Sequence, residues 1–272
     1  MTTPTERRTR LAFHVEGSGA PVVFLHGLTF DRRTWRPILD RLDGAVRAVT
    51  IDLPAHGESA GPPQPLEGLV EQIHEVVTSL GIERPVVVGH SFGAALACFY
   101  ASTHASLGLV TVDDGPEVQP FAEFLHRLAP ALRGPHFAHA WEPIEASLGL
   151  ERIPEPVRSV VLESHVVDQA VVLGYWEQAL STDPATLQQY VDQQLSRIGA
   201  PWLAVFGRPV TAGERERLDR LSHVQIEEWD DAGHFVHLVD PDRFTDHLRR
   251  FVNSAWPPPA SCETRGDADT LG

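Results

Sequence analysis

The stretch Val86-Val-Val-Gly-His-Ser-Phe-Gly-Ala-Ala-Leu-Ala-Cys-Phe-Tyr100 decides the fold of this 272-residue chain. Three β-branched residues, which favour strands, lead into Gly-His-Ser-Phe-Gly, and a run of small and apolar residues follows. Gly89 to Gly93 matches the pattern G-x-S-x-G, in which a serine occupies a tight turn between a strand and a helix. A glycine-flanked surface turn could match the five residues alone. The strand before and the helix after them favour the strand–turn–helix interpretation.

The turn has a chemical purpose if Ser91 is a nucleophile. A strained backbone at the end of a strand projects the hydroxyl above the sheet, where a substrate can reach it. The residues two before and two after must be small to avoid neighbouring backbone, and both are glycine here. The helix that follows points the positive end of its dipole at a developing oxyanion.

Short apolar segments alternate with helical patterns on both sides of this turn. Residues 66–82, for example, carry apolar side chains at helical spacing. Strands that are apolar on both faces and separated by helices are typical of a parallel sheet covered on both sides. We therefore expect an α/β fold with a mostly parallel, doubly wound sheet. The predicted strands are 9–17, 21–27, 46–54, 85–88, 108–115, 201–207 and 224–229.

The alternation stops between residues 116 and 199, where several helices are expected, among them 123–132, 157–180 and 184–198. A helical insertion in an open α/β sheet predicts a lid over the carboxyl edge of the strands, where such sheets bind ligands. We expect a core of residues 1–115 and 200–256, and a helical cap of residues 116–199 between the sixth and seventh sheet strands. The Pro-rich, polar segment 257–272 is expected to be a disordered tail.

Composition limits the partners and the setting. The formal net charge is −15, and all 22 basic residues are arginine, so the surface would repel nucleic acid and anionic membranes. The first ten residues lack the apolar segment of a signal peptide, and no stretch is apolar enough to span a membrane. Cys98 and Cys262 could form one disulfide but provide no framework. We expect a cytoplasmic protein; the sequence leaves its oligomeric state open.

Four motifs in order resemble the α/β-hydrolase fold superfamily over residues 11–255. They are His26-Gly27-Leu28 after the second strand, DLPAHGES at 52–59, the turn at Ser91, and DAGHFVHLVDPDRF at 231–244. Ala55 stands where that family usually has glycine. The resemblance implies that Ser91 is the nucleophile and His234 its general base, because an imidazole both takes and returns a proton near neutral pH.

The resemblance also implies an oxyanion hole made by the backbone N–H groups of Leu28 and Phe92. It implies that His26 shapes the oxyanion loop and does not transfer protons. His237 lies three residues after His234, and the two could suggest a metal pair. No third ligand is evident, so we expect neither a metal nor another cofactor.

The third member of the triad departs from the family's usual pattern. The acid usually follows the penultimate strand in a G-x-x-D arrangement, but here that strand continues Gly207-Arg-Pro-Val210. One alternative is a dyad without a carboxylate. The other is an acid moved to the end of the strand after the nucleophile helix, as in some haloalkane dehalogenases and zearalenone-lactonase-like members.

That strand ends in Asp113 and Asp114, and strand alternation allows at most one of them to face His234. Asp113 matches the dehalogenase placement, and Asp114 matches the lactonase-like one. We slightly favour Asp114. The other acidic candidates are Glu214, Asp230 and Asp231.

These residues predict a serine hydrolase that cleaves a carboxylic ester or lactone through an acyl-enzyme. Alternatives are a hydrolase of carbon–carbon bonds in β-diketone-like substrates and a non-catalytic ligand receptor on the same fold. Trp141, Tyr175 and Trp176 in the insertion suit a small apolar or aromatic substrate. They could equally pack the cap helices against each other.

Overall fold

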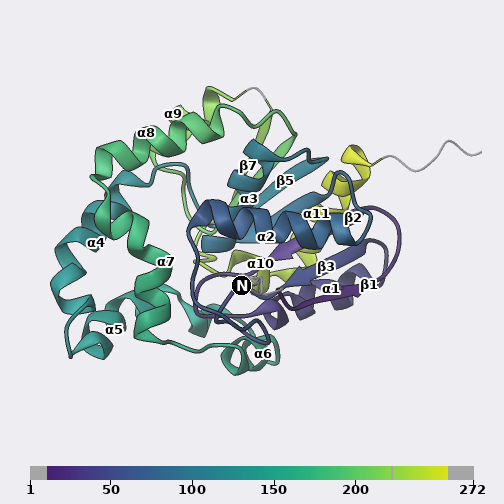
Figure 1. The fold of residues 1–272 in the computed structure, drawn as a ribbon. Helices are drawn as coiled ribbons and strands as arrows, with labels where there is room; N and C mark the ends of the chain where they lie inside the picture. The colour runs from purple at the N-terminus through teal and green to yellow at the C-terminus, as the bar shows by residue number, and fades with distance from the viewer. Residues whose placement is uncertain (1–10, 222, 257–272) are drawn as a thin grey trace, which may run out of the picture.

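A seven-stranded sheet in the order β1-β3-β2-β4-β5-β6-β7 carries the structure (Figure 1). The structure is a computed structural model that describes residues 11–221 and 223–256. β1 pairs with β3 antiparallel, and every other pairing in this sheet is parallel. The expected α/β fold with a mostly parallel sheet is thus confirmed. The strands are β1 (Phe13–Glu16), β2 (Pro21–Leu25), β3 (Arg47–Ile51), β4 (Val86–His90), β5 (Gly108–Val112), β6 (Trp202–Phe206) and β7 (Val224–Glu228).

Helices cover both faces because the central strands are apolar on both sides. In β2, Val23 and Leu25 enter one hydrophobic cluster, and Val22 and Phe24 enter a second cluster on the opposite face. The first cluster includes side chains of α2 (Leu66–Ser79), α3 (Phe92–Thr103) and α9 (Ala212–Asp219). The second includes side chains of η1 (Arg32–Trp35), α1 (Arg36–Leu42), α10 (Val236–Val239) and α11 (Pro241–Ala255).

The helical insertion runs between β5 and β6, and its helices α4 to α7 gather to one side of the sheet (Figure 1). The predicted position between the sixth and seventh strands is wrong by one strand, although the segments 108–115 and 201–207 that were expected to flank the insertion do contain β5 and β6. The insertion comprises α4 (Gln119–Leu132), α5 (Phe137–Ser147), η2 (Leu150–Arg152), α6 (Val157–Glu163), α7 (Gln169–Ser181) and α8 (Pro184–Leu195).

The single helix expected at 157–180 is two helices. α6 ends at Glu163, and α7 begins after Asp168, whose side chain accepts a hydrogen bond from the Val171 N–H. An aspartate in this N-cap position satisfies a free helix N–H and favours a helix start over a helix interior. Between the two helices, the Val166 N–H donates to the Thr29 carbonyl at 2.8 Å. The break therefore brings the insertion into contact with the loop after β2.

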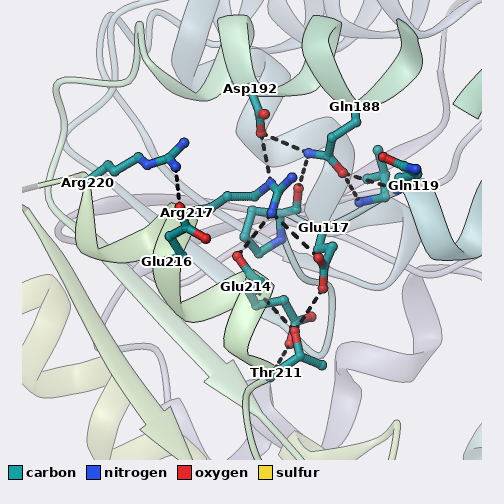
Figure 2. Close-up of polar contacts among 12 residues, drawn as sticks. Glu117, Gln119, Gln188, Asp192, Thr211, Glu214, Glu216, Arg217 and Arg220 are labelled. Carbon is teal, nitrogen blue, oxygen red and sulfur yellow. Dashed lines mark hydrogen bonds and ion pairs between the residues drawn. The ribbon is translucent and has the colours of Figure 1, made fainter. Parts of the chain in front are cut away.

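A polar network joins the insertion to the core at its boundaries (Figure 2). Gln188 of α8 donates to the Pro116 carbonyl at 2.9 Å and accepts from the Val118 N–H at 2.8 Å. Arg217 of α9 donates to Asp192 of α8 at 3.2 Å. The Arg217–Asp192 contact crosses the proposed boundary between a core of 1–115 and 200–256 and a cap of 116–199, whereas the Gln188 contacts lie within the proposed cap. The division stays a prediction.

Two expectations fall on the ends of the chain. The predicted tail and Cys262 lie outside the described residues; Cys98 is buried and forms no disulfide with any described residue. Within the described part of the chain, every helix is too short or too polar to cross a bilayer.

Candidate active site

Ser91 occupies a sharp turn between β4 and α3. Its backbone has φ 53° and ψ −127°, a combination that residues with a side chain rarely adopt. The flanking glycines are required by close packing. A Cβ on Gly89 would lie 2.1 Å from the Gly93 carbonyl oxygen, and one on Gly93 would lie 2.4 Å from that of Leu25. The Ser91 N–H donates to the Val112 carbonyl at 3.0 Å, so the turn is fixed to the end of β5.

His234 lies in the loop after β7, and two backbone contacts fix this loop. The Gly233 N–H donates to the Gly207 carbonyl at 2.9 Å. Nε2 of His90, the residue before Ser91, lies 2.9 Å from the His234 carbonyl and donates to it, since a carbonyl only accepts. Burial lowers the pKa of His90 well below its usual range, so this imidazole is neutral. The base candidate is therefore attached to the same turn that carries the nucleophile candidate.

Asp113 is the carboxylate that contacts His234. Nδ1 of His234 lies 2.9 Å from Oδ2 of Asp113, and Oδ1 accepts the Gly207 N–H at 2.9 Å. Burial by itself would raise the pKa of Asp113, but the hydrogen bond and charge of His234 outweigh it and lower the pKa. Because an ionised carboxylate only accepts, Nδ1 carries the proton and Nε2 of the neutral imidazole has a free lone pair.

The preference for Asp114 is corrected by this geometry. The preference rested on the lactonase-like placement, whereas β5 ends at Val112 and the left-handed φ of 48° at Asp113 accompanies a side chain that contacts His234. Among the described residues, Asp114 has no hydrogen-bond partner. Burial, followed by the charges of Asp113 and Glu214, raises its pKa to about 7.

The other acidic candidates are placed elsewhere. Glu214 accepts two hydrogen bonds from Arg208, at 2.6 and 2.8 Å. Neither Asp230 nor Asp231 is hydrogen-bonded to His234 in the described structure, and the Asp231 carbonyl accepts from Arg152 at 2.5 Å. Of the carboxylates considered from the sequence, Asp113 alone is hydrogen-bonded to the imidazole.

Leu28 and Phe92 both lie near Ser91. Phe92 follows it directly, and a Cβ on Gly27, next to Leu28, would lie 3.3 Å from the Ser91 Cβ. Within the described residues, neither the Leu28 nor the Phe92 backbone N–H has an acceptor. Two free N–H groups beside a serine hydroxyl are what an oxyanion hole requires.

Two buried histidines hold the loop that contains Leu28. His26 Nδ1 lies 2.8 Å from the Gly27 carbonyl, and its Nε2 accepts the Leu53 N–H at 3.0 Å. His56 Nε2 accepts the Thr29 N–H at 3.1 Å. Burial lowers the pKa of both imidazoles to about 4. His56 was not among the residues expected at the site, although it stands inside the motif at 52–59.

The three aromatic candidates of the insertion are split by the structure. The Tyr175 hydroxyl donates to the Pro54 carbonyl at 2.7 Å, and its ring meets Phe92 edge-on at 5.0 Å between centroids. Trp141 and Trp176 lie 5.7 Å apart and contact Phe137 and Phe121, respectively, inside the insertion. Only Tyr175 therefore reaches the turn that carries Ser91 through the contacts described.

His237 is fully buried against Trp35 at 4.8 Å between ring centroids. Both of its ring nitrogens lack a hydrogen-bond partner in the described chain. Within the same residues, no cluster of three or more histidine, cysteine or acidic side chains could hold a metal ion.

Comparison with known proteins identifies a family to which this sequence is similar. A model of the alpha/beta hydrolase family matches residues 22–247. An uncharacterized protein of Mycobacterium tuberculosis is 24% identical over 282 residues, which cover 91% of this chain and 80% of that protein.

Solved structures show the same fold. Est816, described as an N-acyl homoserine lactone degrading enzyme, superposes with a TM-score of 0.71 at 20% identity and covers 90% of this chain and 98% of its own. A thermophilic esterase from Thermogutta terrifontis superposes with a TM-score of 0.70 at 22% identity, over 94% of this chain and 97% of its own.

Proposed function

This chain belongs to the alpha/beta hydrolase family, whose members are hydrolases, and from this premise we propose that it cleaves a carboxylic ester or a lactone. Ser91 is the proposed nucleophile, His234 the general base, and Asp113 the carboxylate that orients it. The observation that carries the proposal is the 2.9 Å hydrogen bond between His234 Nδ1 and Asp113. It leaves Nε2 as the basic nitrogen, which a serine hydroxyl requires for activation.

The reaction has two steps. In the first, Ser91 Oγ attacks the carbonyl carbon while His234 Nε2 takes its proton, and the negative oxygen rests against the N–H groups of Leu28 and Phe92. The tetrahedral intermediate then expels the alcohol, which leaves with the proton from His234. In the second step, water attacks the acyl-enzyme with the same base, and the acid product leaves Ser91 free. The steps use neither a metal nor another cofactor.

The substrate class rests on chemistry and on two relatives. The arrangement fits acyl transfer, and the similar structures are described as an esterase and as a lactone-degrading enzyme. An apolar acyl group suits the half-buried Phe92 ring, which directly follows Ser91. We therefore propose a small to medium-sized apolar or aromatic ester or lactone as substrate.

Turnover of p-nitrophenyl acetate, p-nitrophenyl butyrate and a lactone panel tests the proposal. Wild-type protein should hydrolyse at least one of these substrates, and Ser91→Ala should abolish the turnover. Ser102→Ala is the matched control, because Ser102 lies one helix length away on α3 and donates to the Phe99 carbonyl. Activity that survives in Ser91→Ala, or no turnover of any ester or lactone by wild type, would reject the ester and lactone proposal. Turnover of a β-diketone alone would favour the carbon–carbon hydrolase.

A further inference from the structure

Tyr175 of the insertion contacts the loop that holds the proposed oxyanion hole. Its hydroxyl donates to the Pro54 carbonyl at 2.7 Å, and His56 Nδ1 lies 2.9 Å from the same oxygen. The Tyr175 ring meets the His56 ring edge-on at 5.2 Å and the Phe92 ring at 5.0 Å. Tyr175 therefore contacts Phe92, which carries one proposed oxyanion donor, and the Pro54–His56 loop, which is hydrogen-bonded to the loop that carries the other.

The proton positions on His56 follow from its partners. Because the Pro54 carbonyl only accepts, Nδ1 carries the proton, and Nε2 is left to accept the Thr29 N–H at 3.1 Å. Burial lowers the pKa of His56 to about 4, so this neutral tautomer persists near neutral pH. The imidazole thus connects Pro54 to Thr29 through one donated and one accepted hydrogen bond.

Thr29 transmits this connection to Leu28. Its backbone has a left-handed φ of 70°, which is unusual for a β-branched residue and needs support from its surroundings. The peptide between Leu28 and Thr29 is held on both sides: His56 accepts its N–H, and the Thr29 hydroxyl donates to its carbonyl at 2.6 Å. The orientation of this peptide constrains the direction of the neighbouring Leu28 N–H. The insertion adds a second contact through Val166, whose N–H donates to the Thr29 carbonyl.

We propose that Tyr175 and His56 are positioning residues for the oxyanion hole, through which the insertion fixes the Leu28 N–H. The inference rests on the proposed function, since it assigns the Leu28 N–H to the oxyanion. In this arrangement the hole is complete only when the insertion is seated, because the Tyr175 hydroxyl comes from α7. The role differs from the substrate contact predicted for Tyr175 from the sequence.

A positioning role has a defined kinetic signature. Interactions that strengthen only in the transition state change kcat and leave KM almost unchanged. Complete loss of one oxyanion donor costs about 10²–10³ in kcat, so a donor that is present but misaligned should cost about tenfold. Affinity for a trifluoromethyl ketone should fall with kcat, because its adduct with serine places a negative oxygen in the hole.

Tyr175→Phe tests the proposal, because it removes the hydroxyl and keeps the ring against Phe92. We expect kcat for p-nitrophenyl butyrate to fall about tenfold, KM to stay within about twofold, and the trifluoromethyl ketone Ki to rise about tenfold. Tyr190→Phe is the matched control, since Tyr190 on α8 donates to Glu67 at 2.5 Å. This control should retain wild-type kcat and Ki.

A second pair of variants tests His56. His56→Ala removes the acceptor for the Thr29 N–H, and His56→Gln restores a side-chain oxygen that can accept it. We expect kcat to fall by about tenfold to a hundredfold in the alanine variant and to recover partly in the glutamine variant. Because His56→Ala could destabilise the fold, the kinetics of Tyr175→Phe are the deciding test of the positioning role.

Two outcomes would overturn the inference. One is an unchanged kcat and Ki in Tyr175→Phe; the other is a raised KM with unchanged kcat, which would make Tyr175 a substrate contact. Either result counts against the positioning role only when the wild type shows Ser91-dependent turnover. Without that turnover, the proposed function itself has failed.

Discussion

The loops after β5 and β6 meet at one carboxylate beside the His234 imidazole, where one loop supplies the acceptor and the other a donor. β5 is followed by Asp113, whose carboxylate accepts from His234. β6 is followed by Gly207, whose N–H donates to the second oxygen of that carboxylate. Adjacent parallel strands end at one edge of a sheet, so a side chain on either strand can reach the same loop. A carboxylate placed after either strand could therefore lie beside the same imidazole.

The loop after β6 has a carboxylate of its own, and it is directed away from the imidazole. Glu214 is only 3% exposed, forms a capping box with Thr211 at the start of α9, and pairs with Arg208. A Cβ on Gly115 would lie 1.9 Å from Glu214 Oε1, so the loop after β5 makes room for this carboxylate. The loop after β5 therefore places a carboxylate against the proposed base. The carboxylate that follows β6, that of Glu214, is instead neutralised by Arg208.

Asp113→Asn should have the largest effect. The amide can present a donor to Nδ1 and stabilise the wrong tautomer, so we expect kcat to fall about 10⁴-fold. Asp114→Asn is the matched neighbour and should stay within about fivefold of wild type, because Asp114 has no contact with His234. Ester turnover by both purified variants measures the difference. Near-wild-type rates in Asp113→Asn would show that this carboxylate does not orient the base.

A carboxylate introduced after β6 should recover part of the activity that Asp113→Asn loses. Val210 stands at the family's usual acid position, three residues after Gly207, and is half-buried. In an Asp113→Asn background, Val210→Asp should raise kcat/KM by about tenfold to a hundredfold, a recovery of about 1.4–2.8 kcal/mol. Val210→Asn in the same background is the control. Equal rates in the two double variants would mean that a carboxylate on β6 does not reach the imidazole.

Asp114→Asn should change how stability depends on pH. The pKa of Asp114 is about 7 in the folded protein and near 3.8 ordinarily, so folding binds the proton more tightly. The contribution of the Asp114 side chain to the free energy of unfolding is therefore fully present below about pH 4, and it is lost as the pH rises toward 7. Relative to wild type, the variant should gain up to about 1.4 kcal/mol per pH unit over that window and no more above pH 7. Urea unfolding at pH 5, 6, 7 and 8 measures this, and parallel curves would contradict it.

Arg208→Gln should have the smallest effect. It leaves the buried Glu214 carboxylate without its ion pair, which should cost about 1–2 kcal/mol of unfolding free energy. The cost stays moderate because the Arg208 side chain is 43% exposed. Arg220→Gln breaks an exposed pair with Glu216 (Figure 2) and should cost less than about 0.5 kcal/mol. Equal midpoints in urea for the two variants would place Glu214 in a more solvated site than the structure shows.

The fold was predictable because its determinants are local. β-branched runs, helical periodicity and the two glycines around Ser91 each identify an element from a few neighbouring residues. The position of the acid could be reduced to Asp113 and Asp114, but the choice required the backbone. The strand expected at 108–115 ends at Val112, and the left-handed backbone of Asp113 sets the direction of its side chain in a way that strand alternation does not describe.

The positioning contacts could not be predicted because no sequence spacing defines them. Tyr175 and Pro54 are separated by 121 residues, and Pro54 participates through a carbonyl that every residue possesses. His56 was visible within a motif, yet its partner is the backbone N–H of Thr29 in another loop. Such hydrogen bonds depend on how the insertion packs against the core, and this packing is not encoded in local sequence spacing.

The insertion leaves the sheet from β5 and returns to it at β6, and these two strands are direct neighbours. A foreign helical segment could therefore be grafted between them without altering the strand order. Any such graft must keep the chain from Asp113 to Pro116, because the proposed acid stands immediately before the junction. It must also bring its own side chain to the Pro54 carbonyl. Cap exchange in laboratory evolution would consequently act on turnover as well as on substrate choice.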